Sequence, residues 1–312
     1  MIEVSGVTKR YGKKTAVEDL SFEVRPGVVT GFLGPNGSGK STTMRLILGL
    51  DAPNSGHTRV NGRPYREHAA PLHEVGALLE ARSVHTGRSA LNHLLALAQT
   101  HGIPRKRVAE LIEMVGLKEV AGKRAGDFSL GMGQRLGIAS ALLGDPRTVM
   151  LDEPVNGLDP EGIQWVRRLL KNLASEGRTV FVSSHLMSEM ALTAEHLIVI
   201  GRGKLIADTS VADFLQRASK QAVRVRSPQA ERLAELIAGP DVGVNAVAPS
   251  VLEVTGLDSE QVGTTAAEHG IVLYELSPQT ASLEEAFMEL TRDSVEFHGE
   301  AAQAEPSQAV AS

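Results

Sequence analysis

A glycine-rich run at residues 34–42 constrains the fold of this chain more than any other feature. It matches the G-x-x-x-x-G-K-[ST] pattern of a phosphate-binding loop and reads Gly34-Pro35-Asn36-Gly37-Ser38-Gly39-Lys40-Ser41-Thr42. A β-rich segment at 28–33 precedes the run, and residues 44–50 follow it with a helix-like apolar pattern. In such a loop the backbone N–H groups curl around phosphate oxygens, and the next helix adds the positive end of its dipole. The run therefore predicts an α/β protein that binds a nucleotide through its phosphates.

Two carboxylates further along the chain are suited to act together with Lys40 and Ser41 of this loop. Lys40 is expected to reach the terminal phosphates, and the hydroxyl of Ser41 to ligate Mg²⁺. The apolar residues 149–151 lead into Asp152 and Glu153. We expect Asp152 to hold Mg²⁺ through water, and Glu153 to polarise an attacking water molecule. Two acids and a proline after a strand are often only a turn, so this interpretation depends on the phosphate-binding loop before them.

The bulk composition excludes several other classes of protein. With 312 residues, 42% of them hydrophobic and 22% charged, the chain is expected to form one large globular domain or a large and a small one. Its net charge of −5 gives no drive toward nucleic acid, so we expect no nucleic-acid partner. The absence of cysteine excludes disulfides, thiolate catalysis and cysteine-bound zinc. No signal peptide is evident, and no apolar run reaches the length of about 18 residues that a membrane helix needs, so we expect no direct membrane insertion.

Strands alternate with helices along most of the chain. Short apolar segments typical of buried strands lie at 148–151, 179–182 and 197–200. Helical spacing occurs between them at 161–175 and 187–194, and this alternation predicts a mainly parallel sheet. The stretch 88–143 is mostly helical. We therefore place a helical subdomain at about 80–146, inserted in a nucleotide-binding domain that covers 1–219.

Beyond residue 220 the pattern becomes that of a small α+β domain. Strand-like and helix-like segments follow one another at 222–225, 230–238, 244–248, 251–254, 259–269 and 271–276. Their order, βαββαβ, predicts a ferredoxin-like fold. A last helix is expected at 282–291, within an extension of 220–295. The tail at 296–312, rich in Ala, Gln, Glu and Ser, is predicted to be disordered.

Four further motifs carry a family resemblance. Residues 128–136 read Phe128-Ser129-Leu130-Gly131-Met132-Gly133-Gln134-Arg135-Leu136. This run resembles the signature motif of the ATP-binding cassette (ABC) family. Tyr11 looks like the residue of that family that stacks on adenine, Asn156-Gly157-Leu158-Asp159 like its D-loop, and His185 like its switch histidine. The resemblance covers about residues 2–215 and implies a P-loop NTPase cassette that hydrolyses ATP with Mg²⁺.

The resemblance also implies that two cassettes share their nucleotides. Ser129 and Gly131 would face, from a helix N-terminus, the γ-phosphate bound on a second subunit. Asp159 would couple the two sites across the interface, and His185 would hydrogen-bond the γ-phosphate. We expect a homodimer, or a heterodimer with a similar cassette, that closes on ATP and reopens after hydrolysis. Taken alone, His185 could be an ordinary histidine and Tyr11 an ordinary surface aromatic residue.

Two positions depart from the usual family pattern. Glu80 stands where the loop before the helical subdomain usually has glutamine, and Leu130 stands where the signature usually has glycine. A carboxylate at position 80 could still ligate Mg²⁺, although its charge changes the local field. The segment 129–132 is similar to variants in bacterial exporters, so we do not interpret the site as inactive.

The N-terminal layout, Glu80 and the C-terminal extension resemble exporter cassettes of the daunorubicin- and bacitracin-resistance types. This resemblance implies a subunit that powers the export of a drug, antibiotic, peptide or lipid through a separate membrane permease. Such a subunit would be cytoplasmic and peripheral, held on the inner face of the cell membrane by the permease. An importer motor and a soluble cassette ATPase without a transport role remain alternatives.

Overall fold

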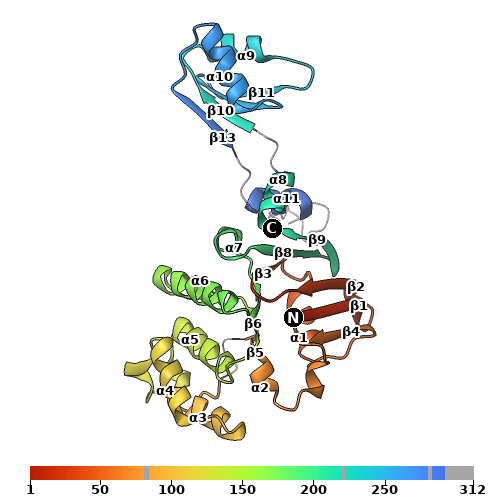
Figure 1. The fold of residues 1–312 in the computed structure, drawn as a ribbon, viewed down its shortest axis with the longest axis vertical. Coiled ribbons are helices and arrows are strands. Elements are labelled where there is room, and N and C mark those ends of the chain that lie inside the picture. Colours follow the sequence, from red (N-terminus) through yellow and green to blue (C-terminus); the bar gives the residue numbers. More distant parts are fainter. Residues whose placement is uncertain (81–83, 219–221, 280–282, 292–312) are drawn as a thin grey trace, which may run out of the picture.

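The computed structural model describes residues 1–80, 84–218, 222–279 and 283–291. Figure 1 shows a cassette of sheets and helices, with a smaller domain joined to it at one end. In these described parts of the chain, no helix is both long and apolar enough to span a membrane. The tail predicted at 296–312 lies outside the described residues.

The centre of the cassette is a six-stranded sheet in the order β5-β6-β7-β3-β8-β9. Its strands are β3 (Val29–Leu33), β5 (Val75–Leu78), β6 (Thr148–Asp152), β7 (Thr179–Ser183), β8 (His196–Gly201) and β9 (Lys204–Ser210). All neighbours are parallel except β8 and β9. β3 and β7 are buried throughout, which fits their short, largely apolar sequences. The predicted, mainly parallel sheet is confirmed.

An antiparallel sheet in the order β2-β1-β4 packs against one face of the central sheet. Its strands are β1 (Ile2–Tyr11), β2 (Lys14–Val24) and β4 (Ser55–Val60), and α1 (Lys40–Ile47) shares their core. The rings of Phe22, Phe32 and Phe181 join the two sheets, with centroids 5.0 to 5.9 Å apart. Because Phe32 lies on β3, this cluster fixes the strand that leads into the phosphate-binding loop.

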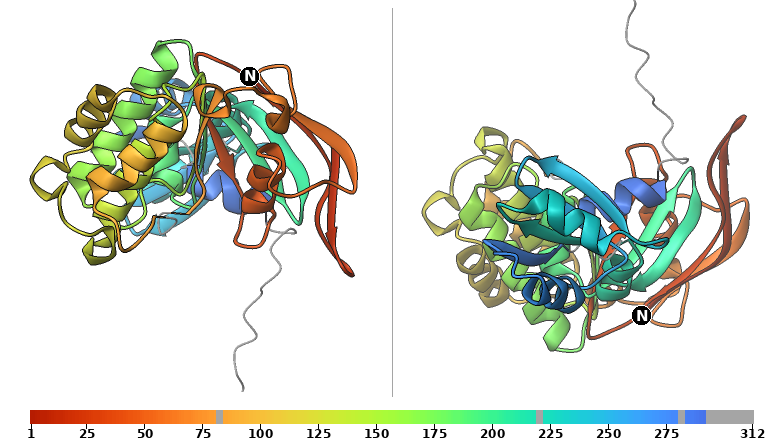
Figure 2. Two further views of the ribbon diagram at one scale, coloured as in Figure 1. Left: turned by 90° about the horizontal axis from the view of Figure 1, so that it is seen from below. Right: turned by 90° about the horizontal axis from the view of Figure 1, so that it is seen from above.

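The helical subdomain is inserted between the parallel neighbours β5 and β6, as predicted. Its helices are α3 (Ala90–Thr100), α4 (Arg105–Met114) and α5 (Leu130–Ala141), with 3-10 turns at Lys118–Val120 and Ala125–Asp127. Before β5, the chain forms a 3-10 turn at Tyr65–Glu67 and the short helix α2 (Pro71–Glu74). One hydrophobic cluster runs from Leu94 and Leu111 through Leu136 to Leu151 of β6, so the subdomain and the sheet share a core. Figure 2 shows these helices on one side of the central sheet and the antiparallel sheet on the other. Helices α6 (Pro160–Ser175), α7 (Met187–Thr193) and α8 (Val211–Ala218) complete the cassette.

The small domain has the predicted βαββαβ order. It consists of β10 (Ala222–Arg226), α9 (Ala230–Ile237), β11 (Gly243–Ala248), β12 (Val251–Thr255), α10 (Ser259–Glu268) and β13 (Glu275–Gln279). Its sheet has the order β11-β12-β10-β13, with every pair antiparallel. Helices α9 and α10 cover one face through a separate hydrophobic cluster that includes Val225, Leu233 and Val262.

Two expectations for this region need correction. The last strand begins at Glu275 rather than at Ile271, because the N–H of Ile271 closes the end of α10 by donating to the carbonyl of Ala266 at 2.8 Å. The last helix, α11 (Leu283–Thr291), was expected within the extension. It instead returns to the cassette, where Leu283 and Phe287 join the same hydrophobic cluster as Phe214 of α8.

Candidate active site

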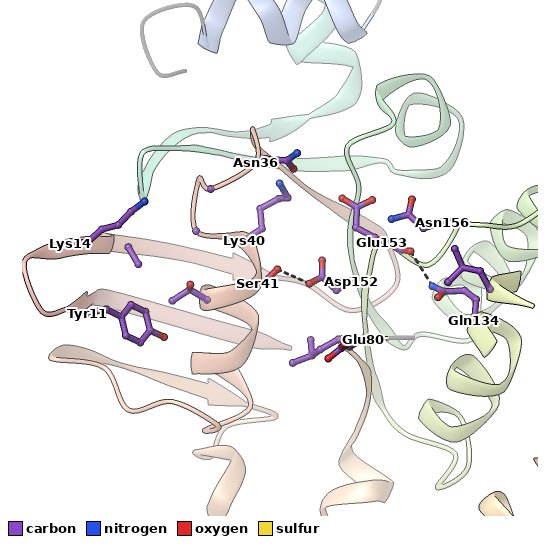
Figure 3. A pocket seen from close by; sticks show the side chains of 16 residues that line it. Tyr11, Lys14, Asn36, Lys40, Ser41, Glu80, Gln134, Asp152, Glu153 and Asn156 are labelled. Atoms are coloured by element: carbon purple, nitrogen blue, oxygen red, sulfur yellow. Dashed lines mark hydrogen bonds between the residues drawn. The ribbon is translucent and has the colours of Figure 1, made fainter. Parts of the chain in front are cut away.

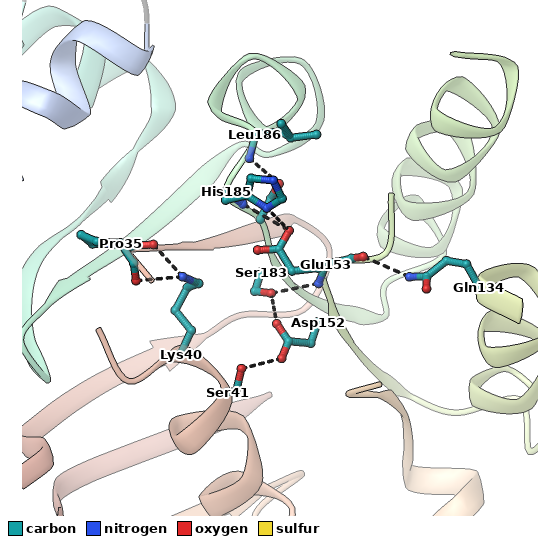
Figure 4. A network of polar contacts seen from close by, with 11 residues as sticks. Pro35, Lys40, Ser41, Gln134, Asp152, Glu153, Ser183, His185 and Leu186 are labelled. Carbon is teal, nitrogen blue, oxygen red and sulfur yellow. Dashed lines mark hydrogen bonds and ion pairs between the residues drawn. The ribbon is translucent and has the colours of Figure 1, made fainter. Parts of the chain in front are cut away.

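The phosphate-binding loop connects β3 to α1 and is shaped by glycine. Gly37 and Gly39 have φ of 80° and 105°, in the left-handed region where a side chain is strained. Pro35 and Ser38 lie in the same loop, where Ser38 is buried, and Thr42 follows in the first turn of α1. The ammonium group of Lys40 donates to the carbonyl oxygens of Gly34 at 2.6 Å and Pro35 at 3.2 Å (Figure 4). The loop therefore curls back over its own lysine.

Gly34 leaves a side chain less room than Gly39 of the same loop does. A Cβ atom there would lie 2.5 Å from the carbonyl oxygen of Ile200 and even closer to the hydroxyl of Ser38. We expect Gly34→Ala to destabilise the cassette by about 1–3 kcal/mol, because overpacking forces the loop away from β8. Thermal unfolding of the purified protein checks this. Gly122→Ala, which meets no atom within 4 Å, is the control. Equal melting temperatures for the two variants would contradict the prediction.

The two predicted carboxylates meet the loop at the carboxyl end of β6. Ser41 donates to Asp152 Oδ2 at 2.8 Å, and the hydroxyl of Ser183, at the end of β7, donates to the other oxygen of Asp152. Burial lowers the pKa of Lys40, and the negative charges of Glu153 and Asp152 oppose that effect. The arrangement brings a cation, two hydroxyls and two carboxylates to the edge of the sheet where the parallel strands β3, β6 and β7 end.

Glu153 occupies an unusual backbone conformation. Its φ is 50°, which a residue with a side chain adopts only when its surroundings hold it there. Its N–H donates to the hydroxyl of Ser183 at 3.0 Å. Its carboxylate oxygen Oε2 lies 2.8 Å from Nδ1 of His185 and 3.3 Å from the backbone nitrogen of the same residue. The candidate base and the candidate switch histidine are therefore in direct contact.

Lys40, Ser41, Asp152 and Glu153 line an open cavity of about 670 Å³ (Figure 3). Ten predicted residues contribute to its wall: Tyr11, Asn36, Gly37, Gly39, Lys40, Ser41, Thr42, Glu80, Asp152 and Glu153. Tyr11 lies at the outer end of β1, 49% exposed, and its hydroxyl donates to Asp51 Oδ2 at 2.9 Å. The hydrogen bond from Arg45 lowers the pKa of Asp51, so this carboxylate stays ionised beside the tyrosine. A cavity of this size accommodates a nucleotide.

Ser129, Gly131 and Asp159 are not part of the cavity wall; Ser129 and Asp159 are exposed, and Gly131 is partly buried. Ser129 is the N-cap of α5 and accepts from the N–H of Met132 at 3.2 Å. Asp159 is the N-cap of α6 and accepts from the N–H of Gly162 at 2.9 Å. Gly131 lies in the first turn of α5, against the carbonyl of Gly157. Within one chain, Ser129, Gly131 and Asp159 therefore do not line the cavity that holds Lys40 and the two carboxylates.

The structure also shows site residues that sequence reasoning did not single out. Ser183 joins Asp152 to the backbone of Glu153, and Gln134 donates to the carbonyl of Glu153 at 3.0 Å. Lys14, Gln134 and Asn156 line the cavity. Gln134 and Asn156 stood within recognised motifs and Ser183 lies two residues before His185, but a motif does not reveal which neighbour its side chains contact.

Comparisons with known proteins agree with this geometry. A family model described as "ABC transporter" matches residues 17–156, and a model of a domain of unknown function (DUF8746) matches residues 221–284. The bacitracin transport ATP-binding protein BcrA of Bacillus licheniformis is 42% identical over 211 residues, which cover 67% of this chain and 69% of that protein. The linearmycin resistance ATP-binding protein LnrL of Bacillus subtilis (strain 168) is 32% identical over 305 residues, which cover 93% of this chain and 98% of that protein.

Among solved structures, the dimeric, post-hydrolysis state of the ATP-binding cassette MJ0796, bound to ADP and Pi, aligns with a TM-score of 0.62. The identity is 25%, and the alignment covers 68% of this chain and 99% of that chain. The phosphate-binding loop and the two carboxylates on a parallel sheet define an ATPase of the P-loop class. Together with the relatives, they show that the chain belongs to the ABC transporter family, as an ATP-binding subunit.

Proposed function

We propose that this chain powers the export of an antibiotic through a separate membrane permease, and that two copies close on two ATP molecules to do so. The observation that carries the proposal is the division of the site. Lys40, Ser41, Asp152 and Glu153 gather in one open cavity, whereas Ser129, the exposed N-cap of α5, is not part of its wall. A second copy would bring its own Ser129 to the open side of the cavity.

Within the cavity, the loop at 34–42 holds the triphosphate, with Lys40 as the cation nearest the terminal phosphates. The donor set beside it suits Mg²⁺, because Ser41, Asp152 and Glu80 supply the hard oxygen atoms that this ion prefers. When bound, Mg²⁺ neutralises charge on the phosphates. Ser183 keeps Asp152 in place for this role by donating to its carboxylate.

Glu153 is the general base in this proposal. Its carboxylate polarises the water that attacks the γ-phosphate. His185, 2.8 Å from that carboxylate, is placed to exchange this contact for one with the γ-phosphate. From the partner chain, the N-terminus of α5, with Ser129 and Gly131, stabilises the phosphate charge through its dipole. Asp159 lies at the start of α6 and would transmit the state of one site to the other.

Tyr11 is proposed to stack on the adenine ring. Loss of one base–aromatic stack costs about 1–3 kcal/mol, so we expect Tyr11→Ala to weaken ATP binding by roughly 5- to 100-fold. Tyr11→Phe keeps the ring and removes only the hydroxyl that bonds Asp51, so it should bind ATP nearly as well as the wild type. Fluorescence titration with an ATP analogue measures both. An alanine variant with unchanged affinity would show that Tyr11 is an ordinary surface residue.

The direction and the cargo rest on relatives. BcrA is named for bacitracin transport and LnrL for linearmycin resistance. We infer that this chain likewise serves an antibiotic exporter, bound through its permease to the inner face of the cell membrane. The match with LnrL covers 93% of this chain and so extends past the cassette into the C-terminal part, which supports a related role.

Everted membrane vesicles that contain the chain and its co-purified membrane partner test the proposal. ATP-dependent uptake of a labelled peptide antibiotic such as bacitracin into these vesicles corresponds to export. The Glu153→Gln variant is the control and should accumulate no label. ATP-driven loss of label from preloaded vesicles would identify an importer instead. A chain that hydrolyses ATP but co-purifies with no membrane protein would be a soluble cassette.

A further inference from the structure

Gln134 is the most buried polar residue in the wall of the cavity that has no role in the proposed function. It lies on α5, and only 2% of it is exposed. Its amide group crosses from the helical subdomain to the central sheet and donates to the carbonyl oxygen of Glu153 at 3.0 Å (Figure 4). A carbonyl oxygen can only accept, so the –NH₂ group of Gln134 must face it.

The hydrogen bond from Gln134 is the second contact that holds the strained backbone of Glu153. Glu153 has a φ of 50°, and its N–H is already bound by the hydroxyl of Ser183 on β7. Gln134 binds the opposite end of the same residue, its carbonyl. The backbone of Glu153 is thus fixed between β7 and α5, and the direction of its carboxylate depends on both contacts.

The start of α5 also touches the segment that follows Glu153. A Cβ atom on Gly157 would overlap the side chain of Leu130, and one on Gly131 would lie 2.8 Å from the carbonyl oxygen of Gly157. Because these contacts leave no free space, a shift of α5 relative to the sheet must move Gly157 or strain the Gln134–Glu153 hydrogen bond. Leu130, which replaces the usual glycine of the signature, therefore tightens this connection.

We propose that Gln134 is a positioning residue for Glu153. It connects the general base of one ATP site to α5, whose N-terminus contacts the nucleotide of the other site. This inference rests on the proposed function, in which Ser129 of α5 contacts the nucleotide of the partner copy. When α5 closes on the partner's nucleotide, its movement is transmitted to Glu153 of its own chain through the buried amide of Gln134. A glutamine is required because it is long enough to cross the gap and donates to the carbonyl without adding a charge beside Asp152 and Glu153.

Gln134→Met tests the need for the donor, since methionine is similar in length and cannot donate. We expect kcat for ATP hydrolysis to fall by roughly 10-fold, while the KM for ATP changes little, because Gln134 acts on the base and not on the nucleotide. The ATP-dependent dimer of a Gln134→Met/Glu153→Gln double variant should form as readily as that of Glu153→Gln alone. Gln99→Met, an exposed glutamine on α3, is the matched control.

Gln134→Glu separates positioning from simple packing. An ionised carboxylate cannot donate to the carbonyl of Glu153, whereas a protonated one can. We therefore expect the ratio of its kcat to that of the wild type to rise as the pH is lowered from about 8.5 to about 6, because nearby Asp152 and Glu153 favour protonation of the new acid. Glu80, Asp152, Glu153, Lys40 and His185 are present in both proteins, and taking the ratio removes the effects of pH that the two proteins share. The same ratio for Gln134→Met should stay flat.

A wild-type kcat in Gln134→Met would overturn the inference, as would a pH-independent ratio for Gln134→Glu. Loss of the ATP-dependent dimer or of the folded state in Gln134→Met would also overturn it, since either points to a packing role. These results differ from a failure of the proposed function itself, in which the wild type would hydrolyse no ATP or Glu153→Gln would form no ATP-dependent dimer.

Discussion

Replacing Glu153 by glutamine is expected to leave ATP binding intact and to reduce turnover by about 10²-fold or more. Glutamine has the same shape and can keep the contact with the backbone N–H of His185, now 3.3 Å from the carboxylate. It cannot accept the proton of the attacking water. The backbone of Glu153, held by Ser183 and Gln134, does not depend on the carboxylate, so the loop at 34–42 should be unaffected.

The measurement is steady-state phosphate release, combined with binding of a fluorescent ATP analogue. Glu119→Gln, which removes a carboxylate from an exposed turn of the helical subdomain, is the matched control and should hydrolyse ATP at the wild-type rate. Because bound ATP persists in Glu153→Gln, size-exclusion chromatography with Mg-ATP should show more dimer than for the wild type. Unchanged turnover would remove Glu153 from the role of base, and Asp152 would become the next candidate.

The parts of the site that could be predicted are those in which sequence neighbours act together. The loop at 34–42 creates its own geometry, because its glycines adopt conformations that few other residues tolerate. Asp152 ends, and Glu153 follows, a strand whose first four residues are buried and include three apolar ones, so their place at the sheet edge follows from the pattern. Parallel strands end at one edge, which brings both motifs into one cavity.

The remaining contacts join segments that are distant in sequence, and no local pattern specifies them. The bond from Gln134 to Glu153 depends on how the helical subdomain packs on β6. The return of α11 to the cassette depends on Leu283 and Phe287 finding a partner in Phe214, whereas an amphipathic pattern shows only that a helix has an apolar face. The late start of β13 has a similar cause, since Ile271 is β-prone but is used to close α10.

Replacing Lys40 by alanine is expected to weaken ATP binding itself. The ammonium group already lies 2.6 Å from the carbonyl of Gly34, inside the loop, so it needs little movement to meet the phosphates. A hydrogen bond between charged groups contributes about 1.5–3 kcal/mol, so we expect the Kd for ATP to rise by roughly 10- to 100-fold. Turnover at low ATP should fall by at least as much, because Lys40 also stabilises charge in the transition state.

Isothermal titration with ATP checks this, with Lys106→Ala on the exposed face of α4 as the control for loss of a positive charge. Burial lowers the pKa of Lys40, so desolvation disfavours the cation in the loop, whereas its hydrogen bonds to the carbonyls of Gly34 and Pro35 favour it. The melting temperature without nucleotide should therefore change little, while the stabilisation that ATP adds should be largely lost. Glu153→Gln and Lys40→Ala then separate two steps of one site, since the first should bind ATP without hydrolysing it and the second should fail to bind it. An unchanged ATP affinity in Lys40→Ala would contradict the assignment of the loop at 34–42, whatever the result for Glu153.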